Sequence, residues 1–385
     1  MFPAARPATV EGHRFHRRKG HPVVFVAWRD LRFARGRFAL MGAVIALISA
    51  LVGLVSGLTA GLARDNVSAI TGLPADRIAF GPSGDGQGPS YADSSVTERQ
   101  WRRWAAAPGV TRAEPLGITT TRATAGGTTV GVTVFGVRPG SALAPDGGTI
   151  DDRSVVLSGP AAEDLGVRAG DAVDLAGRAL TVAAVRGDAS YSHTPVVWTS
   201  LDTWRAAAPP TAAGEGRTAT VVALDVTSDA DVEATDAAVG TRSVPLSESL
   251  SAVGSYPAEN GSLQLMRGFL FVIAALVIGA FFSVWTIQRS ADLAVLKALG
   301  AATANLLRDA LGQAVVLLGV GTAAGTAVAV AVGALVTAAA VPFRLTPATV
   351  LAPAAVIVVL GALGAALSIG RITSVDPLTA LGSAR

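Results

Sequence analysis

The sequence predicts an α-helical membrane protein with four transmembrane helices, one plus three, and a large extracytoplasmic α+β domain between the first and the second. Four long stretches of the 385-residue chain carry no charge: 38–63, 268–288, 310–343 and 345–370. A helix needs roughly 20 mostly apolar residues to cross the hydrocarbon core. Only 15% of the chain is charged, against about 25% in soluble domains. These observations exclude a soluble globular protein.

The predicted segments follow one another along the chain. They are a cytoplasmic basic leader with an amphipathic helix (1–37), the first span (38–63), the extracytoplasmic domain (64–264), the second span (265–288), a cytoplasmic coupling helix (289–309), the third span (310–343), an outer loop with the fourth span (344–370), and a cytoplasmic tail (371–385).

The charge distribution predicts the orientation. The three segments assigned to the cytoplasm hold 14 basic and 5 acidic residues, whereas 64–264 holds 15 Arg and 23 acidic residues. Basic flanks stay in the cytoplasm, and long domains cross regardless of charge. We therefore expect a multi-pass protein of the cell membrane with both termini cytoplasmic. A cleaved signal peptide is the alternative for 38–63, although its apolar run is normally only about 7–15 residues long.

Three glycines in the first span, Gly53, Gly57 and Gly61, recur every four residues. Small residues at this spacing let two helices approach closely in lipid. We expect this face to pack against another helix, such as the same span of a second copy. The alternative is chance in a chain with 43 glycines.

Segment 64–264 reads as mixed α and β, arranged as two small subdomains. Alternating and β-branched runs predict strands, and helical periodicity predicts short helices between them. The expected strands are 76–80, 128–137, 154–158, 166–175, 178–188, 194–199 and 221–226, and the expected helices are 96–107, 160–165 and 229–239.

Several chemistries are excluded by composition. The chain has no Cys, so thiolate nucleophiles and Cys-ligated metals are absent. His193 is the only histidine in the outer segment, so neither a catalytic triad nor a His-rich metal site is expected there. No P-loop motif occurs, so the chain has no ATPase site of this kind. We expect no catalytic residue, no metal site and no nucleic-acid partner.

The connection 289–309 holds the most informative pattern. Asp292, Val295, Leu296 and Leu299 follow helical spacing, and Gly300 ends the run. A short amphipathic helix at the inner face can dock a cytosolic partner. The alternative is a plain connector whose apolar face lies in the lipid headgroups.

The chain resembles the permease subunits of MacB/FtsX-type ATP-binding cassette (ABC) systems. The motif R-x-x-D/E-x-x-x-L-K/R-A-L-G is present as Arg289, Asp292, Leu296, Lys297, Ala298, Leu299 and Gly300. Further matches are Ala27, Arg29, Asp30, Leu31, Arg37 and Phe38 near the start, and Asp376–Leu381 near the end. Asp292 stands where the family usually has Glu, which keeps the charge but shortens the side chain.

The resemblance implies a permease homodimer working with two cytosolic ABC ATPase subunits. ATP and Mg would be bound by the ATPase, and this chain would hold no cofactor. Residues 255–282 look most like the haem-exporting branch from Gram-positive bacteria. The implied function is export of an amphipathic substrate, with haem as one candidate. The alternative is a mechanotransmitter that regulates an extracellular cell-wall hydrolase.

A substrate site is expected where the outer domain meets the second span. Tyr256, Glu259 and Met266 can each offer an iron ligand, and Arg267 could pair with a haem propionate. The alternative is structural, because Arg267 could reach lipid phosphates and Met266 could simply fill space.

Overall fold

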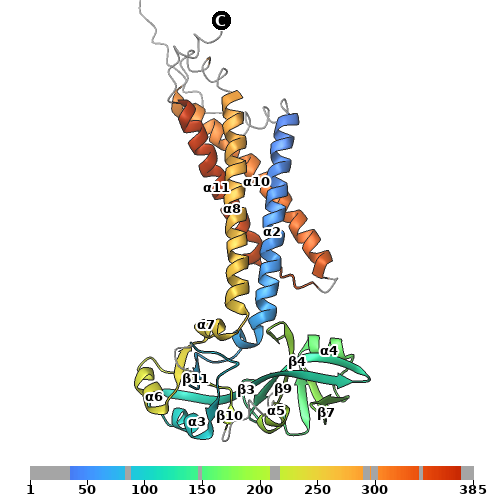
Figure 1. Ribbon diagram of the computed structural model, residues 1–385. Helices are drawn as coiled ribbons and strands as arrows, with labels where there is room; N and C mark the ends of the chain where they lie inside the picture. The colour runs from blue at the N-terminus through green and yellow to red at the C-terminus, as the bar shows by residue number, and fades with distance from the viewer. Residues whose placement is uncertain are drawn as a thin grey trace, which may run out of the picture. The chain divides into compact units, whose positions relative to one another are not determined.

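Four long helices dominate the computed structural model, which describes residues 35–82, 88–145, 150–208, 217–288, 295, 302–337 and 341–373. These helices are α2 (Arg35–Thr71), α8 (Tyr256–Gln288), α10 (Thr303–Thr337) and α11 (Pro347–Thr373) (Figure 1). Each is long and apolar enough to cross a membrane. The predicted arrangement of one helix plus three is confirmed.

All four helices extend beyond their predicted spans, and α2 and α8 do so the furthest. Helix α2 continues to Thr71, eight residues past the predicted end at Ala63. Helix α8 begins at Tyr256, nine residues before the predicted start at Leu265. The prediction relied on uncharged runs. A helix is held by hydrogen bonds between its backbone N–H and C=O groups, so it can continue through polar residues beyond the hydrocarbon core of the membrane. The extensions bring Arg64, Asp65 and Glu259 into helices.

The chain forms two compact units. One comprises residues 1–50, 272–327 and 354–385, and the other comprises 51–271 and 328–353.

The first unit is made of membrane helices that approach closely at glycines. A Cβ on Gly321 would lie 2.8 Å from Ile45, and one on Gly361 would overlap Leu318. The Ser283 and Ser368 hydroxyls are 2.9 Å apart and join α8 to α11. Small residues and hydroxyl pairs therefore provide helix contacts of the kind found in lipid.

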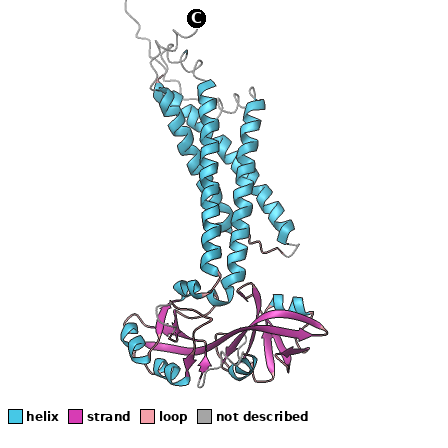
Figure 2. Cartoon of the chain, viewed as in Figure 1, coloured by secondary structure: helices cyan, strands magenta, loops and turns pink. Residues whose placement is uncertain are grey.

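The second unit contains the α+β domain, in which strands and short helices are combined (Figure 2). Its main sheet has the order β12-β1-β11-β3-β4-β9-β5-β7-β6, with β8 paired to β9. A separate two-stranded sheet pairs β2 with β10. The strands are β1 (Arg77–Phe80), β2 (Val96–Thr97), β3 (Val110–Ala125), β4 (Thr128–Val137), β5 (Ser154–Leu157), β6 (Ala172–Leu175), β7 (Arg178–Val185), β8 (Ser190–Tyr191), β9 (Thr194–Ser200), β10 (Arg217–Ala219), β11 (Val221–Val226) and β12 (Arg242–Pro245).

Short helices and one 3-10 turn cover this sheet or follow its strands. They are α3 (Glu98–Ala105), α4 (Gly159–Leu165), α5 (Leu201–Ala207), α6 (Val232–Val239), α7 (Leu246–Ser249) and η3 (Leu250–Ala252). Side chains that accept backbone N–H bonds fix where α3, α4, α5 and α6 begin, and their N-caps are Thr97, Ser158, Ser200 and Asp231.

The 16-residue strand β3 is the main feature that the sequence pattern did not predict. Its first half pairs with β11 and its second half with β4. The two predicted subdomains are therefore lobes of one sheet that share β3. Helix α5 and strand β12 were also missing from the prediction.

Trp204 on α5 anchors the lobe built around β3 and β4. The residue is fully buried, and its ring lies over the cross-strand pair Gly117 and Gly136. A Cβ at either glycine would overlap the indole. Glycine is required at both positions because the helix packs so closely on the strands.

The glycine face of α2 is occupied by residues of the same chain. A Cβ on Gly53 would lie 2.9 Å from the Cβ of Ala329 on α10. Gly57 lies against the Phe343 ring, and Gly61 against the backbone of Pro342. A span of a second copy would therefore have to displace the 341–344 segment to use this face.

Candidate functional site

The four predicted substrate residues all lie in the first three to four turns of α8. Glu259 and Met266 are seven residues apart and so share one face of the helix. Met266 is 52% exposed, while Tyr256 is half-buried against the core that packs on the main sheet. The structure thus separates Tyr256 from the exposed residues of this set.

Glu259 is the centre of a polar cluster that joins three parts of the second unit. Its Oε2 lies 2.8 Å from Nε2 of His193, which follows strand β8. The same oxygen accepts a hydrogen bond of 2.9 Å from Nδ2 of Asn66 on α2. Asn66 Nδ2 also lies 3.2 Å from the Ser255 hydroxyl. Two segments far apart in sequence therefore hold the carboxylate in place.

His193 belongs to the tip of a β-hairpin. Tyr191 on β8 pairs with Thr194 on β9, so Ser192 and His193 form a two-residue loop. Both have positive φ angles, 48° and 61°, as a type I′ turn requires. The turn is fixed by two backbone hydrogen bonds to α2, from Ser192 N–H to the Asn66 carbonyl (2.8 Å) and from His193 N–H to the Asp65 carbonyl (3.1 Å).

Sequence reasoning missed His193 and Asn66 as members of this site. His193 was set aside because it has no second histidine in the outer segment. The predicted strands end at residue 188 and resume at 194, so the two-residue loop between β8 and β9 is seen only in the structure. Asn-Gly or Asp-Gly usually marks such turns, and here the residues are Ser and His. The contact with Asn66 spans 127 positions, which no local pattern reveals.

An ionic group lies at the same end of α2. Asp188 forms an ion pair with Arg64, and Arg344 approaches its other oxygen to 3.9 Å. The pKa of Asp188 is lowered, mainly because Arg64 donates a hydrogen bond to the carboxylate; the charges of both arginines add to this, and partial burial opposes it. Arg344 also donates its backbone N–H to the Gly57 carbonyl at 3.0 Å. These bonds tie the segment before α11 to α2 and to the loop before β8.

An exposed apolar surface follows Glu259 along α8. Leu265, Met266 and Phe269 are 62%, 52% and 60% exposed, and Arg267 lies among them. A carboxylate at one end and apolar side chains at the other match a molecule that is itself amphipathic. In a membrane protein the same side chains also suit contact with lipid.

Most of the predicted coupling residues lie outside the described part of the chain. They are Arg289, Asp292, Leu296, Lys297, Leu299 and Gly300. Val295 is described, as a helical residue that is 58% exposed. The docking role of this set stays a prediction.

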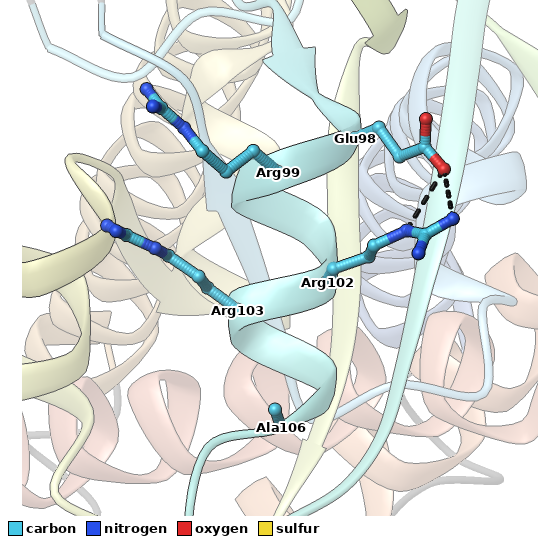
Figure 3. A pocket seen from close by; sticks show the side chains of 5 residues that line it. All are labelled: Glu98, Arg99, Arg102, Arg103 and Ala106. Carbon is cyan, nitrogen blue, oxygen red and sulfur yellow. Dashed lines mark hydrogen bonds and ion pairs between the residues drawn. The ribbon is translucent and has the colours of Figure 1, made fainter.

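A shallow pocket on α3 is lined by Glu98, Arg99, Arg102, Arg103 and Ala106 (Figure 3). Two of the three arginines form hydrogen bonds with neighbouring protein groups. Arg102 Nε donates to Glu98 at 3.0 Å, and Arg103 donates to the Ala238 carbonyl near the end of α6 at 2.9 Å. Cations near the last turn of a helix also stabilise that helix. We therefore interpret this surface as structural, with Arg103 joining α3 to α6.

Metal binding by protein side chains alone has little support in the described residues. Among them, no group of three or more His, Cys, Asp or Glu is close enough to hold an ion. The cluster around Glu259 offers one imidazole and one carboxylate.

Comparison with known proteins finds two family matches that cover most of the chain. Residues 39–242 match the MacB-like periplasmic core domain, and residues 265–377 match the FtsX-like permease C-terminal domain. The first match covers most of α2 and nearly all of the α+β domain. The second match covers α8 from residue 265 onward, together with α10 and α11.

Two of the following relatives are similar over nearly the full length of this chain, and one over part of it. A protein of Staphylococcus haemolyticus named "Putative hemin transport system permease protein HrtB" is 25% identical over 359 residues, which cover 93% of this chain and 99% of the relative. A protein of the same name from Staphylococcus epidermidis is 29% identical over 37% of this chain and 41% of the relative. An uncharacterized ABC transporter permease of Mycobacterium tuberculosis is 24% identical over 94% of this chain and 99% of the relative.

Two solved structures are also similar to part of this chain. They are the periplasmic region of MacB from Actinobacillus actinomycetemcomitans (11% identity, TM-score 0.34, 49% of this chain and 95% of that chain) and the extracellular domain of the transporter YknZ from Gram-positive bacteria (14%, TM-score 0.32, 44% and 98%). With the family matches on both sides of residue 250 and the four apolar helices, the chain belongs to the MacB/FtsX-type ABC transporter permeases.

Proposed function

We propose that this chain is the permease subunit of an ABC exporter that removes an amphipathic substrate, with haemin as the leading candidate. ATP would be hydrolysed by a separate cytosolic subunit that docks on residues 289–309. The proposal places both termini in the cytoplasm, the α+β domain outside, and two permease copies in the working complex. The charge distribution and the family support this arrangement.

The substrate class rests on one observation above all: Glu259, a held carboxylate, begins an exposed apolar face of α8. Haemin combines an iron centre, two carboxylates and a flat apolar ring. Met266 lies on the same face as Glu259, and Arg267 offers a cation for a propionate. We assign Tyr256, Glu259, Met266 and Arg267 as substrate contacts. The hemin transport relative, similar over 93% of the chain, supports this choice.

Growth of cells in toxic haemin tests the proposal. Cells that express the permease with its ATPase should tolerate more haemin than cells with the ATPase alone. Glu259→Ala should remove the protection, while Gly312→Ala, on an open helix position, should keep it. Equal tolerance with and without the permease, or an extracellular hydrolase that co-purifies with it while haemin has no effect, would contradict export.

A further inference from the structure

One short segment of the α+β domain, residues 188–193, is bonded through its backbone to helix α2. We call it the anchor segment; it comprises the loop before β8, strand β8 and the turn to β9. Three of its backbone N–H groups donate hydrogen bonds of 2.8–3.1 Å to α2. The donors are Ser190, Ser192 and His193, and the acceptors are the Ser68 hydroxyl, the Asn66 carbonyl and the Asp65 carbonyl. The Ser68 hydroxyl also donates to the Ser190 carbonyl at 3.2 Å.

Side chains at the two ends of the anchor segment extend these contacts to other parts of the second unit. Asp188 forms an ion pair with Arg64 on α2 and lies 3.9 Å from Arg344, which precedes α11. At the other end, Nε2 of His193 lies 2.8 Å from Glu259 Oε2 on α8. Six consecutive residues therefore hold α2, α8 and the residue before α11 together.

The backbone of the turn shows how firmly α2 holds the anchor segment. Ser192 and His193 have φ angles of 48° and 61°, in a region that residues with a Cβ rarely adopt. Such conformations persist only where the surrounding structure fixes them. The N–H groups of both residues are bonded to α2, so the helix itself imposes the conformation of the turn.

The anchor segment is also part of the sheet. Strands β3, β4, β9, β5, β7 and β6 form a ring that closes where β6 pairs with β3, and we call this ring the barrel lobe. Strand β9 follows the anchor segment directly and pairs with β4 and β5 inside the ring. Tyr191 is 8% exposed and packs in the core that contains Phe135 of β4 and Ile70 of α2.

The covalent connections of α2 and α8 lead to the other lobe. Helix α2 is followed by β1, and α8 is preceded by β12, α7 and η3. Strands β1 and β12 pair with each other and β1 with β11, outside the ring. The barrel lobe is therefore joined to the ends of these helices by the bonds of the anchor segment and by packing, and not by a direct chain connection.

We propose that the anchor segment fixes the barrel lobe rigidly to the ends of α2 and α8, so that movement of these helices is carried into the lobe through β9. Ser68 and Asp188 are positioning residues in this joint. The inference rests on the proposed function, because the helices move only if the ATPase drives them. A physical link of this kind has to stay closed while the helices move.

Distances between two spin labels test whether the joint stays closed. The sequence contains no Cys, so Thr71→Cys at the end of α2 and Ala183→Cys on β7, both exposed, can be labelled specifically. The full-length permease is assembled with its ATPase in lipid nanodiscs and diluted with unlabelled permease, so that distances within one chain dominate. Double electron–electron resonance is recorded without nucleotide and with ATP and vanadate.

Two double variants are compared with the parent. Ser68→Ala with Asp188→Asn removes both bonds of the Ser68 hydroxyl and the ion pair with Arg64. The matched control is Ser251→Ala with Asp164→Asn: the Ser251 hydroxyl bonds to the Glu248 carbonyl three residues earlier, and the described residues show no ion pair for Asp164. Haemin-stimulated and basal ATP hydrolysis are measured on the same samples.

The parent and the control should give one narrow distance distribution that is the same in both nucleotide states. The joint variant should give a broader distribution. Its basal ATP hydrolysis should stay unchanged, while stimulation by haemin should fall about 2- to 30-fold, the range for residues that carry coupling. A residue with a merely structural role would not separate stimulated from basal hydrolysis.

The rigid attachment is overturned if the parent distance shifts between the two nucleotide states, because the lobe then moves against α2. It is also overturned if the joint variant matches the parent in both distance distribution and haemin stimulation. A parent complex that haemin does not stimulate contradicts the proposed function instead, and the distance measurement still decides whether the attachment is rigid.

Discussion

Single residues show how far sequence reasoning reached at the site and where it ended. Glu259 was named as a possible iron ligand where the outer domain meets the second span, and in the structure it lies in a polar cluster; its substrate role stays a prediction. The partners His193 and Asn66 could not be predicted, because they come from a hairpin tip and from a helix that extends beyond its apolar run. Both depend on tertiary contacts, which an isolated sequence does not display.

The ion pair at Asp188 leads to a prediction on pH and stability. Its pKa is lowered in the folded protein, so the pairing stabilises the fold above the unfolded pKa of about 4 and is lost as the pH falls through the folded value. The pair is exposed, so Asp188→Asn should cost only about 0.2–1 kcal/mol at pH 7. The difference from the parent should vanish in strong acid.

Thermal unfolding in detergent between pH 7 and pH 2 measures this effect. Asp164→Asn is the matched control, since the described residues show no ion pair for Asp164, and its curve should follow the parent throughout. An Asp188→Asn protein that keeps the full stability difference in strong acid would show that the effect does not come from the charge.

Among the secondary-structure elements, those with strong periodicity were predicted well. Strand β4 has the predicted bounds, and β9 and β11 differ by at most one residue. Strand β3 was missed because its sequence mixes Thr, Arg, Gly and Pro without alternation. Its long extended form is fixed by two different neighbours, β11 and β4. The length of β3 therefore depends on strands that are distant from it in sequence.

Contacts of α2 with the 341–344 segment predict a ranking of glycine substitutions. A Cβ on Gly61 would overlap backbone atoms of Pro342, whereas one on Gly57 would overlap only the Phe343 ring. A ring can rotate away, but the backbone must shift the whole segment. Gly61→Ala should therefore destabilise the protein by about 1–3 kcal/mol, and Gly57→Ala by less.

The comparison is made by thermal unfolding of the purified permease. Gly312→Ala is the control: nothing lies near its Cβ position, and alanine favours a helix interior by about 0.5–1 kcal/mol. If Gly61→Ala is as stable as Gly312→Ala, the 341–344 segment does not pack on α2 as described. If instead crosslinked dimer alone is lost, the glycine face belongs to a second copy.

For the whole molecule, hydropathy alone was sufficient to predict the four membrane helices. Four uncharged stretches predicted the four long helices and their one-plus-three order, because a span has a minimum length and cannot contain many charges. The boundaries were less accurate, since helices continue where the apolar run stops. The coupling role of segment 289–309 stays a prediction from its motif, because most of the segment lies outside the described residues.

The central claim is that this permease couples ATP hydrolysis by a partner to removal of an amphipathic substrate. The most direct measurement is ATP hydrolysis by the permease and its ATPase in lipid nanodiscs, with and without haemin. Haemin should stimulate hydrolysis in the parent complex. Leu296→Asp places a charge on the proposed docking face and should abolish the stimulation, while the permease still inserts in the membrane. The account would be contradicted if haemin left the ATP hydrolysis rate of the parent complex unchanged, or if haemin stimulated ATP hydrolysis normally in the Leu296→Asp complex.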